Sequence, residues 1–252
     1  MGKVYLVGAG PGAADLLTVR AARLLGSADI VFHDALVEQD VLDLARHAVK
    51  IAVGKRCGAH STSQRFINKR LVDAAKRHSI VVRLKGGDPM LFGRAQEEID
   101  ALAQADIDFE VVPGVTAALA AASDLRLSLT RRGVARSVTM VTPRAGDGET
   151  VNAWTRAAAT ADTAVIYMGA GQAEAISAAL IDQGLPRGTP VVLVENAGRS
   201  TESHCAGVLG DLQRLAASRG AGPAVIVIGE IARTLAAQQA ELGEPLLNCA
   251  AG

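Results

Sequence analysis

The sequence predicts an α/β protein made of two α/β domains with mostly parallel sheets. Short runs of β-branched residues alternate with alanine- and leucine-rich stretches of helical length, a pattern typical of parallel sheets covered on both faces. About nine such runs are more than one ordinary sheet holds, which indicates two α/β units. The pair Pro113-Gly114 ends one run and precedes an alanine-rich helix at 117–122. We therefore predict domains at 1–114 and 115–252.

The expected strands are short, largely apolar runs, and the helices lie between them. The first domain is expected to contain strands at Val4–Val7, Ile30–His33, Val49–Val53, Ile80–Leu84 and Phe109–Val112. The second is expected to contain Ser137–Thr142, Ala164–Met168, Pro190–Val194 and Ala224–Gly229. The expected helices include Asp15–Leu25, Thr62–Arg77, Ala95–Gln104 and Gly171–Gln183.

Composition narrows the classes of function. The 26 basic and 26 acidic residues cancel, so the net charge gives no electrostatic indication of nucleic-acid binding. Aromatic residues make up 3%, too few for the stacking platforms of single-strand binders. Cys57, Cys205 and Cys249 have no metal-ligand spacing, and no apolar run reaches membrane-spanning length. We expect no nucleic-acid partner, no metal and no membrane span. The odd cysteine count and the lack of a leader pattern favour a cytoplasmic protein.

The most informative stretch runs from Val81 to Arg94, where an apolar run ends in Gly86-Gly87-Asp88-Pro89. Two glycines allow positive φ and a close approach of backbone to ligand. The carboxylate of Asp88 adds a fixed acceptor that suits the ribose or the amino group of a nucleoside. A tight strand-to-helix turn without a ligand would use the same residue types.

A second glycine-rich turn, Gly8-Ala9-Gly10-Pro11-Gly12, follows the first expected strand. Such a turn before a helix invites a dinucleotide-binding interpretation, with Asp34 beyond the second strand as the ribose-binding acid. The third glycine, however, follows the second by two positions instead of three. A plain structural turn is the other alternative.

These motifs occur in an ordered series that resembles the tetrapyrrole (corrin/porphyrin) methylase family. The resemblance covers essentially residues 3–232. Its blocks are VYLVGAGPG at 4–12 with DLLT at 15–18, HDALV at 33–37, GKR at 54–56, VRLKGGDPMLFGR at 82–94 with Glu97-Glu98, VVPGVT at 111–116, YMG at 167–169, VEN at 194–196 and GPAVIVIGE at 222–230.

The resemblance implies a fold of two α/β domains with the active site in the cleft between them, and a homodimer. It implies S-adenosylmethionine (SAM) as methyl donor, leaving S-adenosylhomocysteine (SAH), and a tetrapyrrole as the small-molecule substrate. The blocks are most similar to those of members that methylate uroporphyrinogen III twice to give precorrin-2, at the branch toward sirohaem and cobalamin.

The resemblance also implies roles for particular residues. Asp34 is similar to the family's proton acceptor and Lys55 to its proton donor. Contacts to SAM are implied for Pro11, Gly86, Gly87, Asp88, Leu91, Thr116, Ala117, Met168 and Ala197.

Both catalytic candidates have other interpretations. Loss of a proton must follow attack by an electron-rich ring carbon, and a nearby carboxylate can accept that proton. Asp34 could instead cap a helix at 35–44 or bind a ribose. Lys55 could be a solvated loop lysine or could bind a substrate carboxylate.

A substrate with eight carboxylates calls for guanidinium groups, and Arg131, Arg132 and Arg136 are candidates, as are Arg56, Arg65 and Arg94. The block LSLTRR at 127–132 has Ser128 where the family usually has proline and Arg131 where it usually has histidine. A methyltransferase acting on a later precorrin intermediate is therefore the nearest alternative. An NAD(P)-dependent oxidoreductase and a non-catalytic ligand-binding protein are alternatives of other classes.

Overall fold

The computed structural model describes residues 2–53, 63–145 and 154–241. Contacts between Cα atoms divide the chain into two units, Met1–Ala117 and Ala118–Gly252. The division lies shortly after the Pro113-Gly114 pair from which we predicted a boundary at 114. Each unit has its own five-stranded sheet and its own buried hydrophobic residues, which form a core on each face of the first sheet and a core in the second unit.

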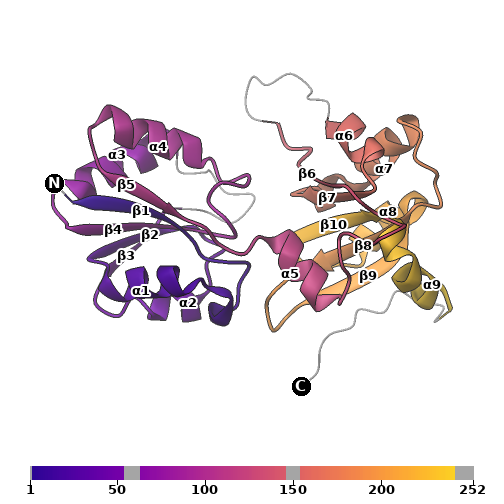
Figure 1. Ribbon diagram of the computed structural model, residues 1–252, viewed down its shortest axis with the longest axis horizontal. Helices are drawn as coiled ribbons and strands as arrows, with labels where there is room; N and C mark the ends of the chain where they lie inside the picture. Colours follow the sequence, from indigo (N-terminus) through magenta and orange to yellow (C-terminus); the bar gives the residue numbers. More distant parts are fainter. Residues whose placement is uncertain (1, 54–62, 146–153, 242–252) are drawn as a thin grey trace. The chain divides into compact units, whose positions relative to one another are not determined.

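The sheet of the first unit is fully parallel and has the order β3-β2-β4-β1-β5 (Figure 1). Its strands are β1 (Lys3–Gly8), β2 (Ile30–His33), β3 (Val49–Ala52), β4 (Ile80–Lys85) and β5 (Phe109–Val112). Because β4 lies between β2 and β1, the order differs from that of dinucleotide-binding domains, in which the second strand lies beside the first.

Helices cover both faces of this sheet. Figure 1 shows α1 (Val19–Ser27) and α2 (Gln39–Asp43) on one face, and α3 (Gln64–Ala75) and α4 (Ala95–Gln104) on the other. Successive strand residues supply the two cores alternately, as the period of a strand requires: Val81 packs with the α3 and α4 core, and Val82 with the α1 and α2 core. The helix expected from Asp15 begins later, because Thr18 caps α1 by accepting a hydrogen bond from the Ala21 N–H.

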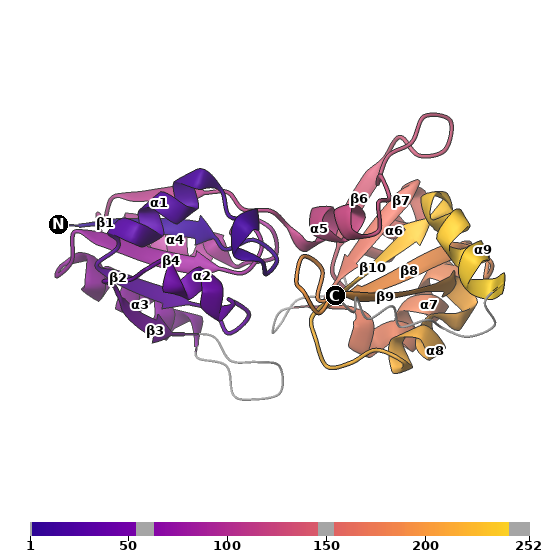
Figure 2. The same cartoon turned by 90° about the horizontal axis from the view of Figure 1, so that it is seen from below.

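The second unit has the strand order β6-β7-β10-β8-β9 (Figure 2). Its strands are β6 (Val138–Val141), β7 (Thr163–Tyr167), β8 (Pro190–Glu195), β9 (Ser203–Val208) and β10 (Ala224–Gly229). Its helices are α5 (Ala117–Asp124), α6 (Trp154–Thr160), α7 (Ala173–Asp182), α8 (Leu212–Ala217) and α9 (Arg233–Glu241). Residues of α6, α7 and α8 share one core with the sheet.

The fold class is confirmed, with one departure in the second sheet. Among the described residues, β6 and β7 pair in parallel, whereas the β7–β10, β10–β8 and β8–β9 pairs are antiparallel. The segment 196–202 between β8 and β9 is too short for the crossover that parallel neighbours need. The expected strands omitted β9, whose sequence SHCAGV is not an apolar run.

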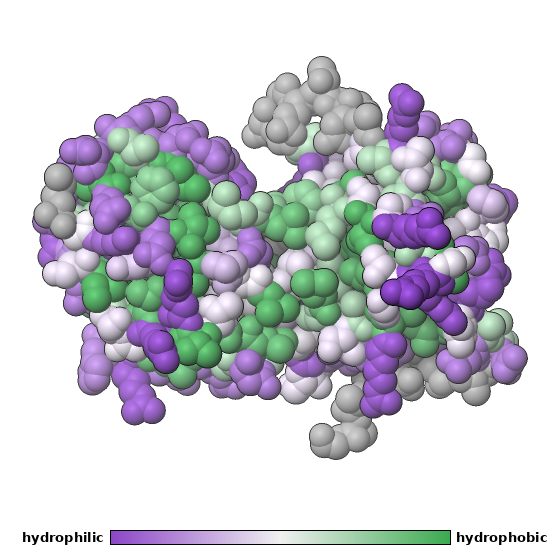
Figure 3. All heavy atoms as spheres, in the orientation of Figure 1, coloured by the Kyte–Doolittle hydropathy of each residue, from purple (hydrophilic) through white to green (hydrophobic). Residues whose placement is uncertain are grey.

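On the face drawn in Figure 3, hydrophilic side chains line much of the margin of the first unit. Within the described ranges, no helix combines the length and the apolar character needed to cross a bilayer.

Candidate active site

The carboxyl ends of β1, β4 and β5 meet at one edge of the first sheet, and the loops that leave them carry glycines. Gly10 and Gly87 pair through two backbone hydrogen bonds, of 3.2 Å from Gly10 N to Gly87 O and 2.7 Å from Gly87 N to Gly10 O. Both residues have positive φ, 71° and 67°. The two glycine turns singled out in the sequence therefore touch each other, at the edge where open α/β sheets bind ligands.

The inner side of these turns is closed by backbone. A Cβ added to Gly8 would lie 2.6 Å from the Cα of Gly114 and 2.7 Å from the carbonyl oxygen of Gly87. A Cβ added to Gly114 would collide with the same oxygen. Glycine is required at these two positions because three loops approach each other backbone to backbone.

The outer side is open. A Cβ on Gly86 would meet only the Leu36 Cβ, at 3.7 Å, and Gly86 has no positive φ. Neither packing nor backbone conformation requires glycine there. A missing side chain on an exposed turn gives a ligand access to the backbone, so Gly86 fits the nucleoside-binding interpretation better than that of a plain turn.

Asp88 holds this arrangement together. Its Oδ1 accepts a hydrogen bond from the Met90 N–H at 2.8 Å, and its Oδ2 accepts one from the Gly114 N–H at 2.9 Å. The first bond closes the turn after β4, and the second ties that turn to the loop after β5. The carboxylate is thus fixed in place by backbone donors.

The segment after Asp88 contains two residues in a conformation that side chains disfavour. Phe92 and Arg94 both have φ of 55°, and such backbone outliers cluster at functional sites. Arg94 donates two hydrogen bonds to the Glu97 carboxylate, at 2.7 and 2.8 Å, which lower the pKa of Glu97. Met90 and Phe92 are exposed.

The remaining expected cofactor contacts of the first unit lie at the same edge. Pro11 follows Gly10, and Leu91 donates its N–H to the Asp88 carbonyl. The Cα of Thr116 lies 4.0 Å from the position of a Cβ on Gly87. Ala117 begins α5 next to Thr116. The structure therefore brings together residues from three segments of the first unit, which follow β1, β4 and β5.

Two further expected contacts lie in the second unit, each within two residues of the end of a strand. Met168 follows β7, has φ of 56° and is 43% exposed, whereas Ala197 follows β8 and is buried. Because β7 and β8 both run antiparallel to β10, which lies between them, their carboxyl ends reach the same edge of the second sheet. The cofactor roles of both residues stay predictions.

Asp34 follows β2 and is held by an arginine. Its Oδ1 accepts a hydrogen bond from the Nη2 of Arg83 at 2.6 Å, and its side chain is 31% exposed. The helix-cap interpretation is wrong, since α2 begins at Gln39 and its N-cap residue is Glu38. Lys55, the second catalytic candidate, lies outside the described residues.

Sequence reasoning missed a buried charged group next to Asp34. Arg83 and Lys85 on β4 are 3% and 2% exposed, and Glu98 on α4 is fully buried between them. The signal was present, because a central parallel strand is normally apolar, and IVVRLK contains two cations at alternate positions. Burial and repulsion from Arg83 lower the pKa of Lys85. Burial alone would also lower the pKa of Arg83, but Asp34 and Glu98 raise it.

Three of the candidate arginines surround one depression in the second unit. It has a volume of about 480 Å³ and is lined by Thr130, Arg131, Arg132, Ala135 and Arg136. Arg131 and Ala135 pair across a tight turn, which brings the guanidinium-bearing positions together. In the described part of the chain, no cluster of three or more His, Cys, Asp or Glu side chains is placed to hold a metal ion.

Comparison with known proteins identifies the family. The model of the Tetrapyrrole (Corrin/Porphyrin) Methylases matches residues 3–213. The chain is 43% identical to a uroporphyrinogen-III C-methyltransferase of Pseudomonas aeruginosa over 242 residues, 96% of this chain and 98% of that protein. It is 46% identical to siroheme synthase 1 of Klebsiella pneumoniae over 91% of this chain, and it spans about half (49%) of that longer protein.

Solved structures show the same likeness. Uroporphyrin-III C-methyltransferase from Thermus thermophilus, complexed with S-adenosyl homocysteine, superposes with a TM-score of 0.81 at 38% identity, over 92% of this chain and 100% of that one. A cobalt precorrin-4 methyltransferase superposes with a TM-score of 0.80 at 28% identity, over 91% and 95% of the two chains. With the motifs in order and the match running almost from end to end, this chain belongs to the tetrapyrrole (corrin/porphyrin) methylase family.

Proposed function

We propose that the chain is a SAM-dependent C-methyltransferase that converts uroporphyrinogen III to precorrin-2 by two methyl transfers. The observation that carries this proposal is the 43% identity to the P. aeruginosa uroporphyrinogen-III C-methyltransferase over nearly the full length of both proteins. The SAH complex of the T. thermophilus relative supports the choice of methyl donor.

The glycine edge of the first sheet is suited to that donor. When bound, SAM supplies a methyl group on a sulfonium that is already a good leaving group. Gly86 leaves room for the nucleoside beside the backbone, and Asp88 is rigidly placed beside it. Positioning of two reactants is expected to supply most of the acceleration, on the order of 7–11 kcal/mol in well-oriented pairs.

The residues around Asp34 would complete the reaction. Attack by a ring carbon breaks the carbon–sulfur bond, forms a carbon–carbon bond and moves the positive charge to the macrocycle. Loss of a proton from the ring then neutralises this positive charge. We propose that Asp34 accepts this proton, because its carboxylate is partly exposed and is oriented by Arg83. Lys55 remains the proposed proton donor.

The deciding experiment is anaerobic incubation of the protein with SAM and uroporphyrinogen III, followed by mass spectrometry. We expect mono- and dimethylated products and two equivalents of SAH per dimethylated ring. Reactions without SAM are the control. Bound SAH with no methylated product would mean that the acceptor is another tetrapyrrole.

Methylation of a later precorrin intermediate is the second candidate. It is favoured by Ser128 and Arg131, where the family pattern has other residues, and by the likeness to the cobalt precorrin-4 methyltransferase. Competition between uroporphyrinogen III and later intermediates in one reaction separates the two candidates.

The strand order of the first sheet argues against the oxidoreductase alternative, and calorimetry with NAD(P)H and SAH tests it directly. A homodimer and a cytoplasmic location stay predictions.

A further inference from the structure

The buried charges of β4 all lie on the face of the sheet that α3 and α4 cover. Arg83 and Lys85 point to the same side as Val81, whose side chain belongs to the α3 and α4 core. Two cations inside such a core require partners, since an unpaired buried charge is strongly destabilising.

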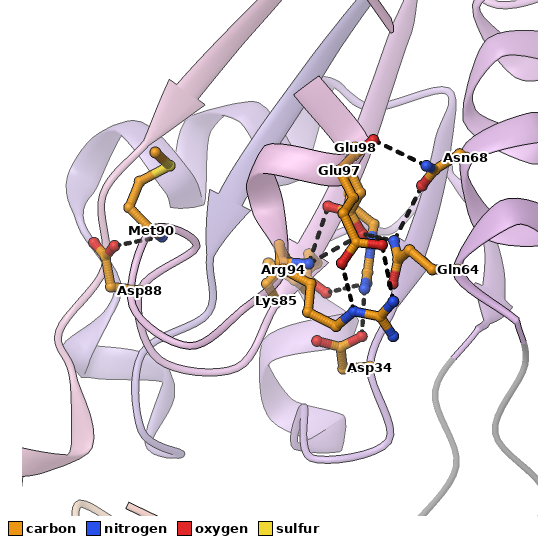
Figure 4. A network of polar contacts seen from close by, with 11 residues as sticks. Asp34, Gln64, Asn68, Lys85, Asp88, Met90, Arg94, Glu97 and Glu98 are labelled. Atoms are coloured by element: carbon orange, nitrogen blue, oxygen red, sulfur yellow. Dashed lines mark hydrogen bonds and ion pairs between the residues drawn. The ribbon is translucent and has the colours of Figure 1, made fainter. Parts of the chain in front are cut away.

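Glu98 is the central partner. Its carboxylate accepts hydrogen bonds from the Arg83 Nε at 3.0 Å, from the Lys85 Nζ at 3.0 Å on both oxygens, and from the Gln64 Nε2 at 3.1 Å. Figure 4 shows Lys85 and Gln64 converging on Glu98, with Asp34 beside the same cluster. Glu98 is therefore held from three sides and cannot turn without breaking several bonds.

Each of the three nitrogens of the Arg83 guanidinium donates a hydrogen bond. Nε binds Glu98, Nη1 binds the Leu84 carbonyl at 3.1 Å, and Nη2 binds the Asp34 Oδ1 at 2.6 Å. The planar fork is thus locked, and it presents Nη2 in one direction. Of the four charged residues, Asp34 alone has a substantially exposed side chain.

Lys85 extends the cluster beneath the loop after β4. Its Cε lies 3.2 Å from the position of a Cβ on Gly93, and the Pro89 carbonyl lies 2.6 Å from that position. The buried charged cluster therefore packs beneath the loop that carries Asp88 and also holds the Asp34 carboxylate. If these charged groups served only to neutralise one another inside the core, none of them would need to lie at the exposed edge of the sheet, as the Asp34 carboxylate does.

We propose that Arg83 and Glu98 are positioning residues for methyl transfer: Glu98 locks the Arg83 guanidinium, and Arg83 aims the Asp34 carboxylate at the proton it accepts. This inference rests on the proposed function. It assigns Arg83 and Glu98 no contact with the substrate or SAM, and it predicts that they act through Asp34.

A double-mutant cycle on the full-length protein tests the proposal. Asp34→Asn, Arg83→Gln and the double variant are assayed with SAM and uroporphyrinogen III, with SAH affinity and thermal unfolding measured in parallel. We expect Asp34→Asn to lower kcat about 100-fold, the scale of general-base loss. Arg83→Gln should lower kcat about 10-fold with little change in the KM for SAM. The double variant should be no slower than Asp34→Asn alone, because residues that act as a unit are not additive.

Arg83→Lys distinguishes positioning from charge balance. Lysine keeps the positive charge of arginine. It lacks the planar guanidinium, so it cannot donate to Glu98, the Leu84 carbonyl and Asp34 in one fixed geometry. We expect Arg83→Lys to keep the unfolding temperature closer to that of the wild type than Arg83→Gln does, while its kcat stays low. If Arg83→Gln does not fold, Glu98→Gln replaces it in the cycle and should show the same lack of additivity with Asp34→Asn.

The outcomes separate the inference from the proposed function. Losses that multiply in the double variant, or a wild-type kcat in Arg83→Lys, overturn the positioning role while the methyltransferase assignment stands. A wild-type protein that binds SAH but methylates no tetrapyrrole overturns the proposed function and this inference with it.

Discussion

Asp88 uses both oxygens of its carboxylate for backbone N–H groups, one in its own turn and one in the loop after β5. A residue held in this way keeps its position when no ligand is present. The same position lies next to Gly86, where the chain leaves room beside its backbone. At the scale of single residues, the same carboxylate therefore stabilises the turn and lies at the proposed ligand site.

We expect Asp88→Ala to weaken SAH binding by about 1.5–3 kcal/mol, the scale of hydrogen bonds to a charged group. The variant loses the carboxylate and also releases the Met90 and Gly114 N–H groups. Calorimetry measures the change, with Asp88→Asn as the matched variant that retains one acceptor. An unchanged Kd in Asp88→Ala would mean that Asp88 serves only the turn.

Asp34→Ala should abolish most methylation while leaving SAH affinity within about twofold, because its proposed role is in proton removal and not in binding SAM. Asp40→Ala, at an exposed position in α2, is the matched control and should retain wild-type kcat. Turnover by Asp34→Ala at the wild-type rate would transfer the base role to another group. In that case Asp34 would have a role outside proton transfer, such as binding a ribose.

At the scale of elements, three loops at the carboxyl ends of β1, β4 and β5 meet at glycines. Gly8, Gly87 and Gly114 come within contact of one another through backbone atoms alone. The expected ligand site is thus built on the ends of adjacent strands. Strain or bulk in one loop will be transmitted to the others, because packed backbone has no side chain that can move aside.

Gly114→Ala is expected to destabilise the protein by about 1–3 kcal/mol, as overpacking does, because its Cβ would collide with the Gly87 carbonyl. Gly26→Ala in α1 is the control. A Cβ there has no neighbour within 4 Å, and alanine is favoured over glycine in a helix by up to about 1 kcal/mol. Urea unfolding of both variants should give changes of opposite sign. Equal stability of Gly114→Ala and the wild type would contradict the close approach.

Asp162 connects two elements of the second unit and predicts an acid-sensitive contact. It accepts hydrogen bonds from the Arg136 N–H, the Ser137 N–H and the Ser137 hydroxyl, and the backbone bond from Arg136 is the first cause of its lowered pKa. A carboxyl whose pKa is lowered in the folded state stabilises the fold above its unfolded pKa, here near 3.8. That contribution is lost as the pH falls through the lower, folded value.

Asp162→Asn should therefore reduce the fall in unfolding temperature between about pH 6 and about pH 3. Thermal scans of the wild type and the variant at both pH values measure it. Asp182→Asn, in α7, serves as a control without this set of backbone donors. The same acid dependence in Asp162→Asn and the wild type would show that other carboxylates govern it.

At the scale of the whole molecule, the chain forms two units with separate cores and balanced charge. A ligand that binds the folded chain and not the unfolded one stabilises it by mass action. The proposed function predicts that SAH is such a ligand.

SAH at about 100 times its Kd should stabilise the protein by about 2.7 kcal/mol, seen as a higher unfolding temperature. NADH at the same concentration should have no effect. Asp88→Ala should require more SAH for the same increase. An increase with NADH and none with SAH would favour the oxidoreductase alternative.

The sequence by itself determined the first unit and its candidate site to a large degree. The short apolar runs predict β2 and β5, and a stretch of helical length between two such runs predicts α4, each with the bounds that the structure has. The glycine turns at 8–12 and 86–88 and the ordered motifs identified the family. These features are local, so short stretches of chain carry them.

Tertiary structure alone decided the rest. The antiparallel pairing of β8, β9 and β10 depends on contacts between distant segments, and SHCAGV carries no strand pattern of its own. The insertion of β4 between β2 and β1 places Arg83 beside Asp34, 49 positions away in the chain. Burial, pairing and the direction of a guanidinium are properties of neighbours in space, and only the folded chain brings those neighbours together.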